Sequence, residues 1–361
     1  MKRSQRWRTT LTVGAAAGAA LILGSCSVNT AYDSASSTAQ LGTGYPVVVN
    51  NCGFTQTFTE APKRVLLLQG ASVGEATTLI ELGVAGSVLA SAQHYGVSDI
   101  PGMAAKVDAL PKDGLKLNAA MDVPAEQVLA RRPDLVISTW SGGFDPKFGF
   151  ASRQTLEQAG IRTLVNPVNC AYGKAGNVTT AEKTAYENGS VVSSLEFITL
   201  MGRVYGVEDR AKSVVDGLRD RIRTVGVKVV GKPKKKMLIA YPDMSVMNSN
   251  GLPAVFSGNI YDSVVRSAGG EPSFPGGGSQ LTSNLSAEQL AAAEVDVLVI
   301  GAWRPGEDLA AEARKLFAAY PQWSASKTKT FVAVSDGPYL GPANAAAIEK
   351  IAKVAHPDAG W

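Results

Sequence analysis

The sequence predicts two α/β lobes, each with a mostly parallel sheet, joined by one long helix. Three observations lead to this fold class. Short apolar runs alternate with segments of helical spacing along the chain, which is typical of parallel strands connected by helices. One block, a helix start followed by a buried strand, occurs in both halves of the chain. A long amphipathic stretch separates the two halves.

The individual elements follow from the periodicity and from Gly and Pro stops. Strands of the first half are predicted at 64–68, 87–92, 134–138 and 162–165. In the second half, strands are predicted at 236–241, 296–301 and 330–334, and helices at 261–268, 287–293 and 343–355. The roughly 315 residues after the N-terminal region are enough for two cores.

The repeated block places one glutamate at an equivalent position in each half. It runs AEQVLA at 125–130 and DLVI at 134–137, and again AEQLAA at 287–292 and DVLVI at 296–300. Pro124 and Ser286 stand at the helix starts, so Glu126 and Glu288 fall in first turns, where carboxylates are favoured. Helix-start chemistry explains each glutamate alone, and their pairing indicates in addition a docking role.

The segment between the halves is predicted to form two helices. Residues 195–205 make one amphipathic helix that Gly206 ends. An apolar stripe from Ala211 to Ile222 then predicts a helix over about 208–225, which at 1.5 Å per residue reaches roughly 27 Å. This length is sufficient to brace two lobes, and its stiffness leads us to expect only modest closure on a ligand.

The first 25 residues have the features of a signal peptide. Four basic residues precede the apolar stretch 11–23, which is too short to cross a bilayer comfortably. Small residues then lead to Cys26, as at a lipoprotein cleavage site. We expect cleavage before Cys26 and attachment of lipid, including palmitate, to this cysteine, so that the chain is anchored on the extracytoplasmic face of the cell membrane. An ordinary secretory signal cleaved nearby is the alternative.

The composition after the signal peptide excludes some classes of partner. Residues 26–45 are rich in Ser, Thr, Ala and Gly and are predicted to be a flexible tether. Without the four basic residues of the signal, the chain has 31 basic and 31 acidic residues, which does not favour nucleic-acid binding. No later segment is long and apolar enough to span a membrane, so lipid alone provides the anchor.

Two cysteines, Cys52 and Cys170, remain besides Cys26. An oxidising exterior favours a disulfide between them, and two buried free thiols are the alternative. A metal site is disfavoured, because these cysteines and the only histidines, His94 and His356, are too few to supply its ligands.

The order and spacing of these motifs resemble the substrate-binding lipoproteins of ABC importers for ferric siderophores, haem or cobalamin. The likeness extends from about Pro46 to the C-terminus. The motifs that carry it are APKRV at 61–65, ELGV at 81–84, 126–137, GGE at 269–271, 286–300 and VAV at 332–334.

The resemblance implies two Rossmann-like lobes joined by one long helix. We therefore divide the chain into a signal peptide (1–25), a tether (26–45), an N-terminal lobe (46–190), a helical linker (191–228) and a C-terminal lobe (229–361). In this family one glutamate on each lobe engages arginines of the permease, and Glu126 and Glu288 match those positions. The implied partners are an ABC permease with its ATPase. An actinobacterial-looking branch with an Asn-Cys-Gly before the first strand further favours the Cys52–Cys170 disulfide and an iron compound as ligand.

Ligand-binding residues are expected just beyond the carboxyl ends of the strands, where open parallel sheets bind their ligands. An iron chelate with apolar faces and negative charge suits flat side chains and a guanidinium. The candidates are Gln69, His94, Tyr95, Trp140, Tyr241, Trp303, Arg304 and Tyr339. Trp140 and Trp303 end equivalent strands and are expected to face each other across the cleft. For each aromatic residue, packing at the rim of its lobe is the alternative.

Other functions are less favoured by the residues. Haem bound through His94 and Tyr241, or cobalamin in the same cleft, are the alternatives to a siderophore. A catalytic role is disfavoured, because Ser324 and Lys327 have Ser-x-x-Lys spacing without the partner motifs of penicillin-binding enzymes. A lipoprotein that binds iron for sensing, without a permease, is a third alternative. We expect a monomeric binding protein, not an enzyme, with no cofactor and no resident metal.

Overall fold

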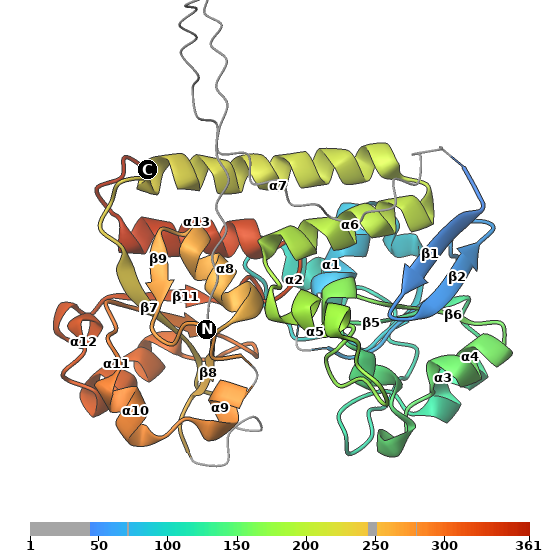
Figure 1. The fold of residues 1–361 in the computed structure, drawn as a ribbon, viewed down its shortest axis with the longest axis horizontal. Coiled ribbons are helices and arrows are strands. Elements are labelled where there is room, and N and C mark those ends of the chain that lie inside the picture. Colours follow the sequence, from blue (N-terminus) through green and yellow to red (C-terminus); the bar gives the residue numbers. More distant parts are fainter. Residues whose placement is uncertain (1–43, 71, 245–250, 279) are drawn as a thin grey trace, which may run out of the picture. The chain divides into compact units, whose positions relative to one another are not determined.

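A computed structural model describes residues 44–70, 72–244, 251–278 and 280–361 (Figure 1). The predicted signal peptide, Cys26 and nearly all of the predicted tether lie outside these residues. Gly44 and Tyr45, at the end of the tether, are described. The Tyr45 hydroxyl donates a hydrogen bond to the carbonyl of Val204 at 2.9 Å, so the chain is held against the folded part from Tyr45 onward.

The N-terminal sheet has four parallel strands in the order β4-β3-β5-β6. Their bounds are β3 Val65–Leu67, β4 Val88–Ser91, β5 Leu135–Ser138 and β6 Arg162–Val165. The helices of this lobe are α1 Gly74–Glu81, α2 Met103–Asp108, α3 Ala125–Arg131, α4 Arg153–Gln158 and α5 Thr180–Glu187. Each strand coincides with a predicted apolar run to within two residues at either end.

The C-terminal sheet has the order β11-β10-β7-β8, and β9 also pairs with β7. Its strands are β7 Lys235–Tyr241, β8 Ala254–Phe256, β9 Gly270–Pro272, β10 Val297–Gly301 and β11 Phe331–Val334. All pairs are parallel except β7 with β8. The helices are α8 Asn259–Ser267, α9 Gln280–Asn284, α10 Ala287–Ala292, α11 Leu309–Ala319, α12 Ser324–Thr328 and α13 Asn344–Ala355.

Both sheets are covered on both faces, which explains why their strands are continuous apolar runs. Successive residues of a strand enter different cores: Val65 and Leu67 pack with α1 and α6, whereas Leu66 packs toward α3 and α4. In the second lobe the same alternation divides β7, whose Leu238 faces α10–α12 while Ile239 faces α8 and α13. The predicted fold class, two Rossmann-like lobes with mostly parallel sheets, is confirmed.

Helices α6, Val191–Tyr205, and α7, Glu208–Val229, connect the lobes along one side of the molecule (Figure 1). The apolar stripe of α7 serves both cores: Ala211 and Val215 belong to that of the first lobe, and Val225 to that of the second. The helix is four residues longer than predicted, about 33 Å at 1.5 Å per residue. The extension brings Val229 onto the second core, a tertiary contact that outweighs the low helix propensity of Gly226.

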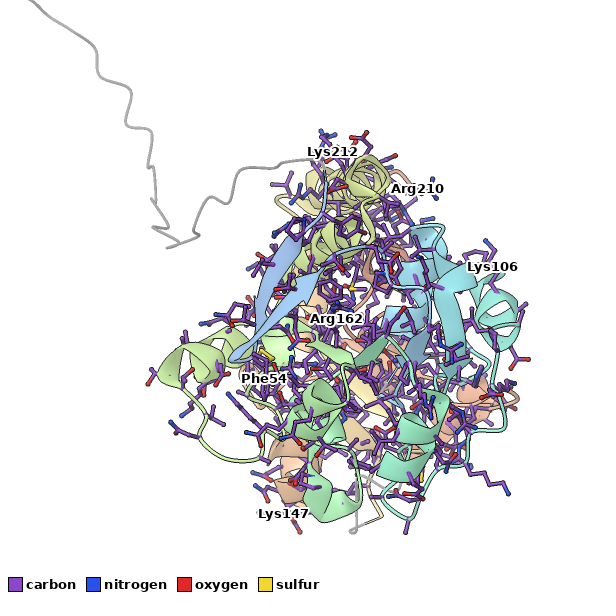
Figure 2. All side chains as sticks on the ribbon, turned by 90° about the vertical axis from the view of Figure 1, so that its right-hand side faces the viewer. Phe54, Lys106, Lys147, Arg162, Arg210 and Lys212 are labelled. Carbon is purple, nitrogen blue, oxygen red and sulfur yellow. A yellow bond between two sulfur atoms is a disulfide. The ribbon has the colours of Figure 1, made fainter. Side chains whose placement is uncertain are left out.

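A hairpin of β1 Val47–Asn51 and β2 Phe54–Phe58 precedes the N-terminal sheet and was not identified from the sequence. Cys52 and Gly53 form its turn with φ of 55° and 87°, the left-handed conformation that two-residue hairpin turns require. Figure 2 views this side of the molecule, with Phe54 labelled on the hairpin and Arg162 on β6. The Asn51 side chain exchanges hydrogen bonds of 2.8 and 2.9 Å with the backbone of Val165, so the hairpin covers the edge of β6.

The disulfide joins Cys52 in this turn to Cys170, which follows β6. The Cys170 carbonyl accepts a hydrogen bond from the Ser141 hydroxyl at 2.8 Å. The bond therefore ties the hairpin to the loops beyond the carboxyl ends of β5 and β6.

Aspartates hold the two lobes together beside the cavity described below. Asp99, in the loop after β4, accepts hydrogen bonds from the amides of Ser335 and Gly337, both at 2.8 Å. In return the Asp336 carboxylate accepts a hydrogen bond from the Asp99 amide at 2.7 Å. Lys350 on α13 approaches the other Asp99 oxygen at 2.7 Å. Both carboxylates are buried, so the lobes are joined by charged hydrogen bonds as well as by α7.

Candidate ligand-binding site

A cavity of about 340 Å³ lies between the lobes, beyond the carboxyl ends of both sheets. Its N-lobe wall comes from the residues that follow β3, β4, β5 and β6, and its C-lobe wall from those that follow β7, β10 and β11. The volume is at the lower end of the range for small-molecule pockets. Its position is the one expected for ligands of open parallel sheets.

Aromatic side chains dominate the lining: Tyr95, Trp140, Tyr172, Tyr186, Phe256, Tyr261, Trp303 and Tyr339. On the N-lobe side three of them form a stack, with ring centroids 5.0 Å apart for Trp140 and Tyr172 and 5.5 Å apart for Tyr172 and Tyr186. Tyr95 meets Trp303 of the other lobe at 6.0 Å. The cavity therefore offers flat, polarizable faces from both lobes.

Glycines position the Trp140 ring. A Cβ on Gly142 would lie 2.2 Å from this ring and one on Gly173 would lie 2.4 Å from it, so only glycine leaves room at either position. Gly142 lies in the short turn after β5, and Gly173 follows Cys170 of the disulfide. The orientation of Trp140 is thus set by two close backbone approaches from different segments.

The polar part of the wall is centred on Asp122, which lies just before α3. Its Oδ1 accepts hydrogen bonds from the amides of Gln69 and Val123, both at 2.8 Å. Burial raises the pKa of Asp122 to about 7. Burial also raises the pKa of Tyr95, whose hydroxyl contacts the Gly70 carbonyl and the Gln69 side chain, to about 12.

Two further polar atoms of lining residues are buried without a hydrogen-bond partner in the described part of the chain. They are Gln69 Oε1 and Trp303 Nε1, an acceptor from one lobe and a donor from the other. Such atoms carry a free-energy cost unless a partner satisfies them.

The structure brings five of the eight predicted ligand residues to this cavity: Gln69, Tyr95, Trp140, Trp303 and Tyr339. It places Tyr241 behind the wall. Tyr241 is fully buried, donates a hydrogen bond to the Ser335 carbonyl at 2.6 Å and packs against the rings of Phe256 and Tyr339. Its position at the end of central strand β7, covered on both faces, explains this.

The two remaining candidates, His94 and Arg304, are not among the lining residues. His94 turns toward its own strand, with Nε2 2.6 Å from the Ser91 carbonyl, and burial lowers its pKa. Arg304 is exposed, and its guanidinium lies 4.8 Å from the centroid of the Trp303 ring. The predicted pairing of aromatic rings with a guanidinium inside the cleft is therefore not the arrangement that the structure shows.

Several lining residues were missed by the sequence analysis, namely Asp122, Tyr172, Tyr186, Phe256 and Tyr261. Asp122 precedes a predicted helix and has no strand before it. Tyr172 and Tyr186 lie in and beyond the irregular loop after β6, and Phe256 ends β8, which was not predicted. The sequence signal was weak here because these segments have no period that points to the cleft.

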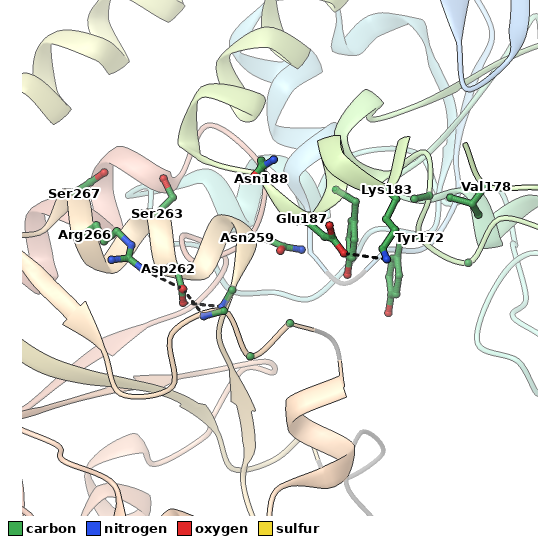
Figure 3. A pocket seen from close by; sticks show the side chains of 18 residues that line it. Tyr172, Val178, Lys183, Glu187, Asn188, Asn259, Asp262, Ser263, Arg266 and Ser267 are labelled. Atoms are coloured by element: carbon green, nitrogen blue, oxygen red, sulfur yellow. Dashed lines mark hydrogen bonds and ion pairs between the residues drawn. The ribbon is translucent and has the colours of Figure 1, made fainter. Parts of the chain in front are cut away.

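A wider groove of about 1110 Å³ adjoins the cavity between α5 and α8 (Figure 3). Tyr172, Tyr186 and Asn259 line both spaces. The charged side chains of the groove are paired: Lys183 with Glu187 at 3.7 Å, and Arg266 with Asp262 at 3.5 Å.

The predicted docking residues are on the surface, away from the cavity lining. Glu126 is exposed in the first turn of α3, and Glu288 is exposed in the first turn of α10. Backbone and Ser286 hydrogen bonds lower the pKa of Glu288. Figure 1 shows α3 and α10 in different lobes but on the same side of the molecule, opposite α7.

The described residues were also compared with what a metal site and a membrane-spanning helix require. They contain no cluster of three or more His, Cys, Asp or Glu side chains suited to a metal ion. Within the same ranges, none of the helices combines the length and the apolar character that a membrane span needs.

The protein has two lobes with mostly parallel sheets, one long helix that braces them, and a cavity beyond the carboxyl ends of the strands. This is the arrangement of solute-binding proteins. The model of the periplasmic binding protein family matches residues 75–334, and the chain belongs to this family. The resemblance drawn from the sequence motifs is confirmed. Membership makes the protein extracytoplasmic and implies delivery of a small solute to an ABC permease.

Solved structures show the same fold. An ABC-type Fe3+-hydroxamate transport protein from Saccharomonospora viridis is 21% identical, with a TM-score of 0.63 over 88% of this chain and 100% of the other. The haem-binding protein RhuT from Roseiflexus is 17% identical, with a TM-score of 0.58 over 82% and 98%. BauB, bound to acinetobactin and ferric iron, is 18% identical, with a TM-score of 0.59 over 86% and 98%. No curated protein matches the sequence.

Proposed function

We propose that this protein captures a ferric siderophore outside the cytoplasm and delivers it to an ABC permease. The observation that carries the proposal is the cavity between the lobes, whose wall has eight aromatic side chains and few polar groups. A ferric chelate presents its organic surface to the protein and already holds its metal, so it needs flat apolar contacts and no metal ligands from the chain.

Haem and cobalamin remain the alternative ligands for the same cavity. His94, the predicted axial ligand for haem, lies outside the lining, and so does Tyr241. Haem binding would therefore depend on one of the lining tyrosines. The hydrolase alternative receives no support, because Ser324 and Lys327 lie on α12, which contributes nothing to the cavity.

Tryptophan fluorescence tests the ligand directly. Trp140 and Trp303 line the cavity, so saturable quenching is expected with a ferric siderophore, and Trp140→Phe with Trp303→Phe should remove most of it. Trp361→Phe is the matched control, since Trp361 lies at the C-terminus and its indole bonds the His356 carbonyl. Quenching by haem or cobalamin, without quenching by a ferric siderophore, would make that compound the ligand instead. No response to any of the three would refute the proposal.

Permease docking through Glu126 and Glu288 forms the second part of the proposal. Both carboxylates are exposed at helix starts on the same side of the two lobes. Glu126→Ala with Glu288→Ala should abolish uptake of the radiolabelled iron chelate while leaving its affinity unchanged. Glu157→Ala with Glu294→Ala provides the control, because these exposed glutamates also lie one in each lobe. Unchanged uptake in the first double variant would favour a sensing lipoprotein.

The lipid anchor is the third part, and it rests on the sequence alone. Residues 1–25 with Cys26 predict cleavage and lipidation, and residues 27–45 would keep the binding protein near its permease. Labelled palmitate should be incorporated by the wild type and not by Cys26→Ala, which should also leave the membrane fraction. Membrane retention of Cys26→Ala would contradict the anchor. A monomer is expected by light scattering.

A further inference from the structure

The charge of the cavity wall points to a ligand class. Among the described lining residues, Asp122 is the ionisable acid, and there is no Lys, Arg or His. The residues adjoining the cavity in sequence but outside the described ranges, 71, 245–250 and 279, include no basic residue either. Arg304 is exposed and is not a lining residue, and Lys174 is paired with Glu182 at 2.5 Å.

The carboxylate of the lining residue Asp122 is only partly satisfied. Its Oδ1 is occupied by the amides of Gln69 and Val123, whereas Oδ2 has no hydrogen-bond partner in the described part of the chain. A second buried carboxyl group lies beneath the wall: Glu75 accepts the hydroxyl of Thr139, itself a lining residue, at 2.8 Å. Asp122 is thus the acidic side chain of the described lining, and no described cation of the lining offsets its charge.

We propose that the cavity selects a neutral or cationic ferric chelate over an anionic one, with Asp122 as the specificity-determining residue. The proposal rests on the proposed function and narrows it. Hydroxamates carry one negative charge each, so three of them on ferric iron give a neutral complex. Catecholates carry two each, which leaves three negative charges on the complex. The favoured ligand class is therefore the hydroxamate type, or a chelate with an added amine.

The physical reason is desolvation. An anion that enters this cavity loses its water, meets a carboxylate and finds no described cation in the lining, so it loses hydration energy without compensation. A neutral chelate buries apolar surface against the rings at no such cost. A cationic group gains attraction from Asp122, which is stronger in a partly buried site than in water.

The preference is expected to grow with pH. Because burial raises the pKa of Asp122 to about 7, the residue is mostly neutral near pH 6 and mostly ionised near pH 8. The titratable side chain that faces it is Tyr95, whose raised pKa keeps it neutral over this range. Among the described residues, the other groups at Asp122 are the Gln69 and Val123 amides, the Asn118 side chain and Ser138 near Gly143. Glu75 accepts a hydrogen bond from the Thr139 hydroxyl, and burial raises its pKa as well.

The test uses one trihydroxamate skeleton loaded with ferric iron, with a terminal group that is a free amine, an acetylated amine or a succinylated amine. These chelates differ by one charge each and share the iron centre. At about pH 8 the amine and acetyl forms should bind the wild type, and the succinyl form should bind on the order of tenfold more weakly. Asp122→Asn should reduce this difference to about twofold, whereas Asp145→Asn, a buried aspartate outside the lining, should preserve it.

The outcomes separate this proposal from the proposed function. Equal affinities for the three chelates in the wild type would overturn the charge preference and leave siderophore capture standing. Failure of all three to bind, together with failure of the wider panel, would overturn siderophore capture. A preference that persists in folded Asp122→Asn would overturn the role of Asp122. If that variant does not fold, the wild-type affinity ratio at about pH 6 and pH 8 decides, since a constant ratio contradicts the proposal.

Discussion

Replacing Asp99 by alanine is expected to weaken the connection between the lobes. Asp99 belongs to the first lobe, and its Oδ2 accepts the amides of Ser335 and Gly337 in the second, both at 2.8 Å. The carboxylate is buried, and Lys350 contacts its other oxygen at 2.7 Å. Alanine removes all three partners at once without changing the backbone path.

The magnitude follows from the groups left behind. Each buried amide that loses its acceptor costs about 1–3 kcal/mol, so two amides cost about 2–6 kcal/mol. The Lys350 contribution is about 1 kcal/mol at most, because nearly half of that side chain is exposed and solvent screens the pair. Water that enters beside the truncated residue satisfies part of the loss. We expect the free energy of unfolding to fall by about 3 kcal/mol.

Urea unfolding with the disulfide intact measures this change, followed by tryptophan fluorescence and by circular dichroism. The control is Asp108→Ala, because Asp108 is exposed and pairs with Lys112 at the surface, so a loss below about 0.5 kcal/mol is expected there. A loss below about 1 kcal/mol for Asp99→Ala, with an unchanged denaturant slope, would refute the reasoning. Separate transitions by the two probes would show instead that the lobes had become independent.

Three further predictions concern the disulfide, Asp336 and Gly142, which positions the Trp140 ring. Removing Cys52 and Cys170 as a pair should lower the free energy of unfolding by about 3–5 kcal/mol, because the bond closes a loop with a sequence separation of 118; equal urea midpoints with and without reductant would contradict this. Burial raises the pKa of Asp336 from 3.8 to about 6. The contribution of this residue to the free energy of unfolding is therefore fully present below about pH 4 and is lost as the pH rises through about 6. Asp336→Asn should flatten this decline, which is about 3 kcal/mol at most; an unchanged pH profile of stability would exclude Asp336 as its source. Gly142→Ala should displace the Trp140 ring, weaken ligand binding on the order of tenfold and lower the unfolding free energy by about 1–3 kcal/mol; wild-type quenching in this variant would show that the ring is held in another way.

Much of the architecture was predictable because it depends on local periodicity. Apolar runs identified the parallel strands β3, β4, β5, β6, β7, β10 and β11, and Gly206 marked the end of α6. The hairpin β1–β2 was missed, although exposed and buried residues alternate along β2. Its strands pair with each other and contact β6 through the Asn51 and Gln56 side chains, a long-range contact that the sequence does not indicate. The last turn of α7 was also missed, because the second core stabilises it.

The site was only partly predictable. The rule that ligands lie beyond the carboxyl ends of strands identified Gln69, Tyr95, Trp140, Trp303 and Tyr339 as cavity residues, because that position follows from strand order. Whether a residue after a strand faces inward depends on the next loop and on the opposite lobe, as the outward Arg304 shows.

The sequence by itself determined the two α/β lobes, the bridging helix, the family and the equivalent positions of Glu126 and Glu288, since each depends on residues close together in the chain. The tertiary structure alone decided the chemistry of the cavity. Asp122 and Tyr172 come from irregular segments of the N-terminal lobe, and Trp303 comes from the other lobe, so the wall forms only when segments far apart in the chain pack together. The direction of a loop side chain is set by contacts far away in sequence, and those contacts have no periodic signature in the chain.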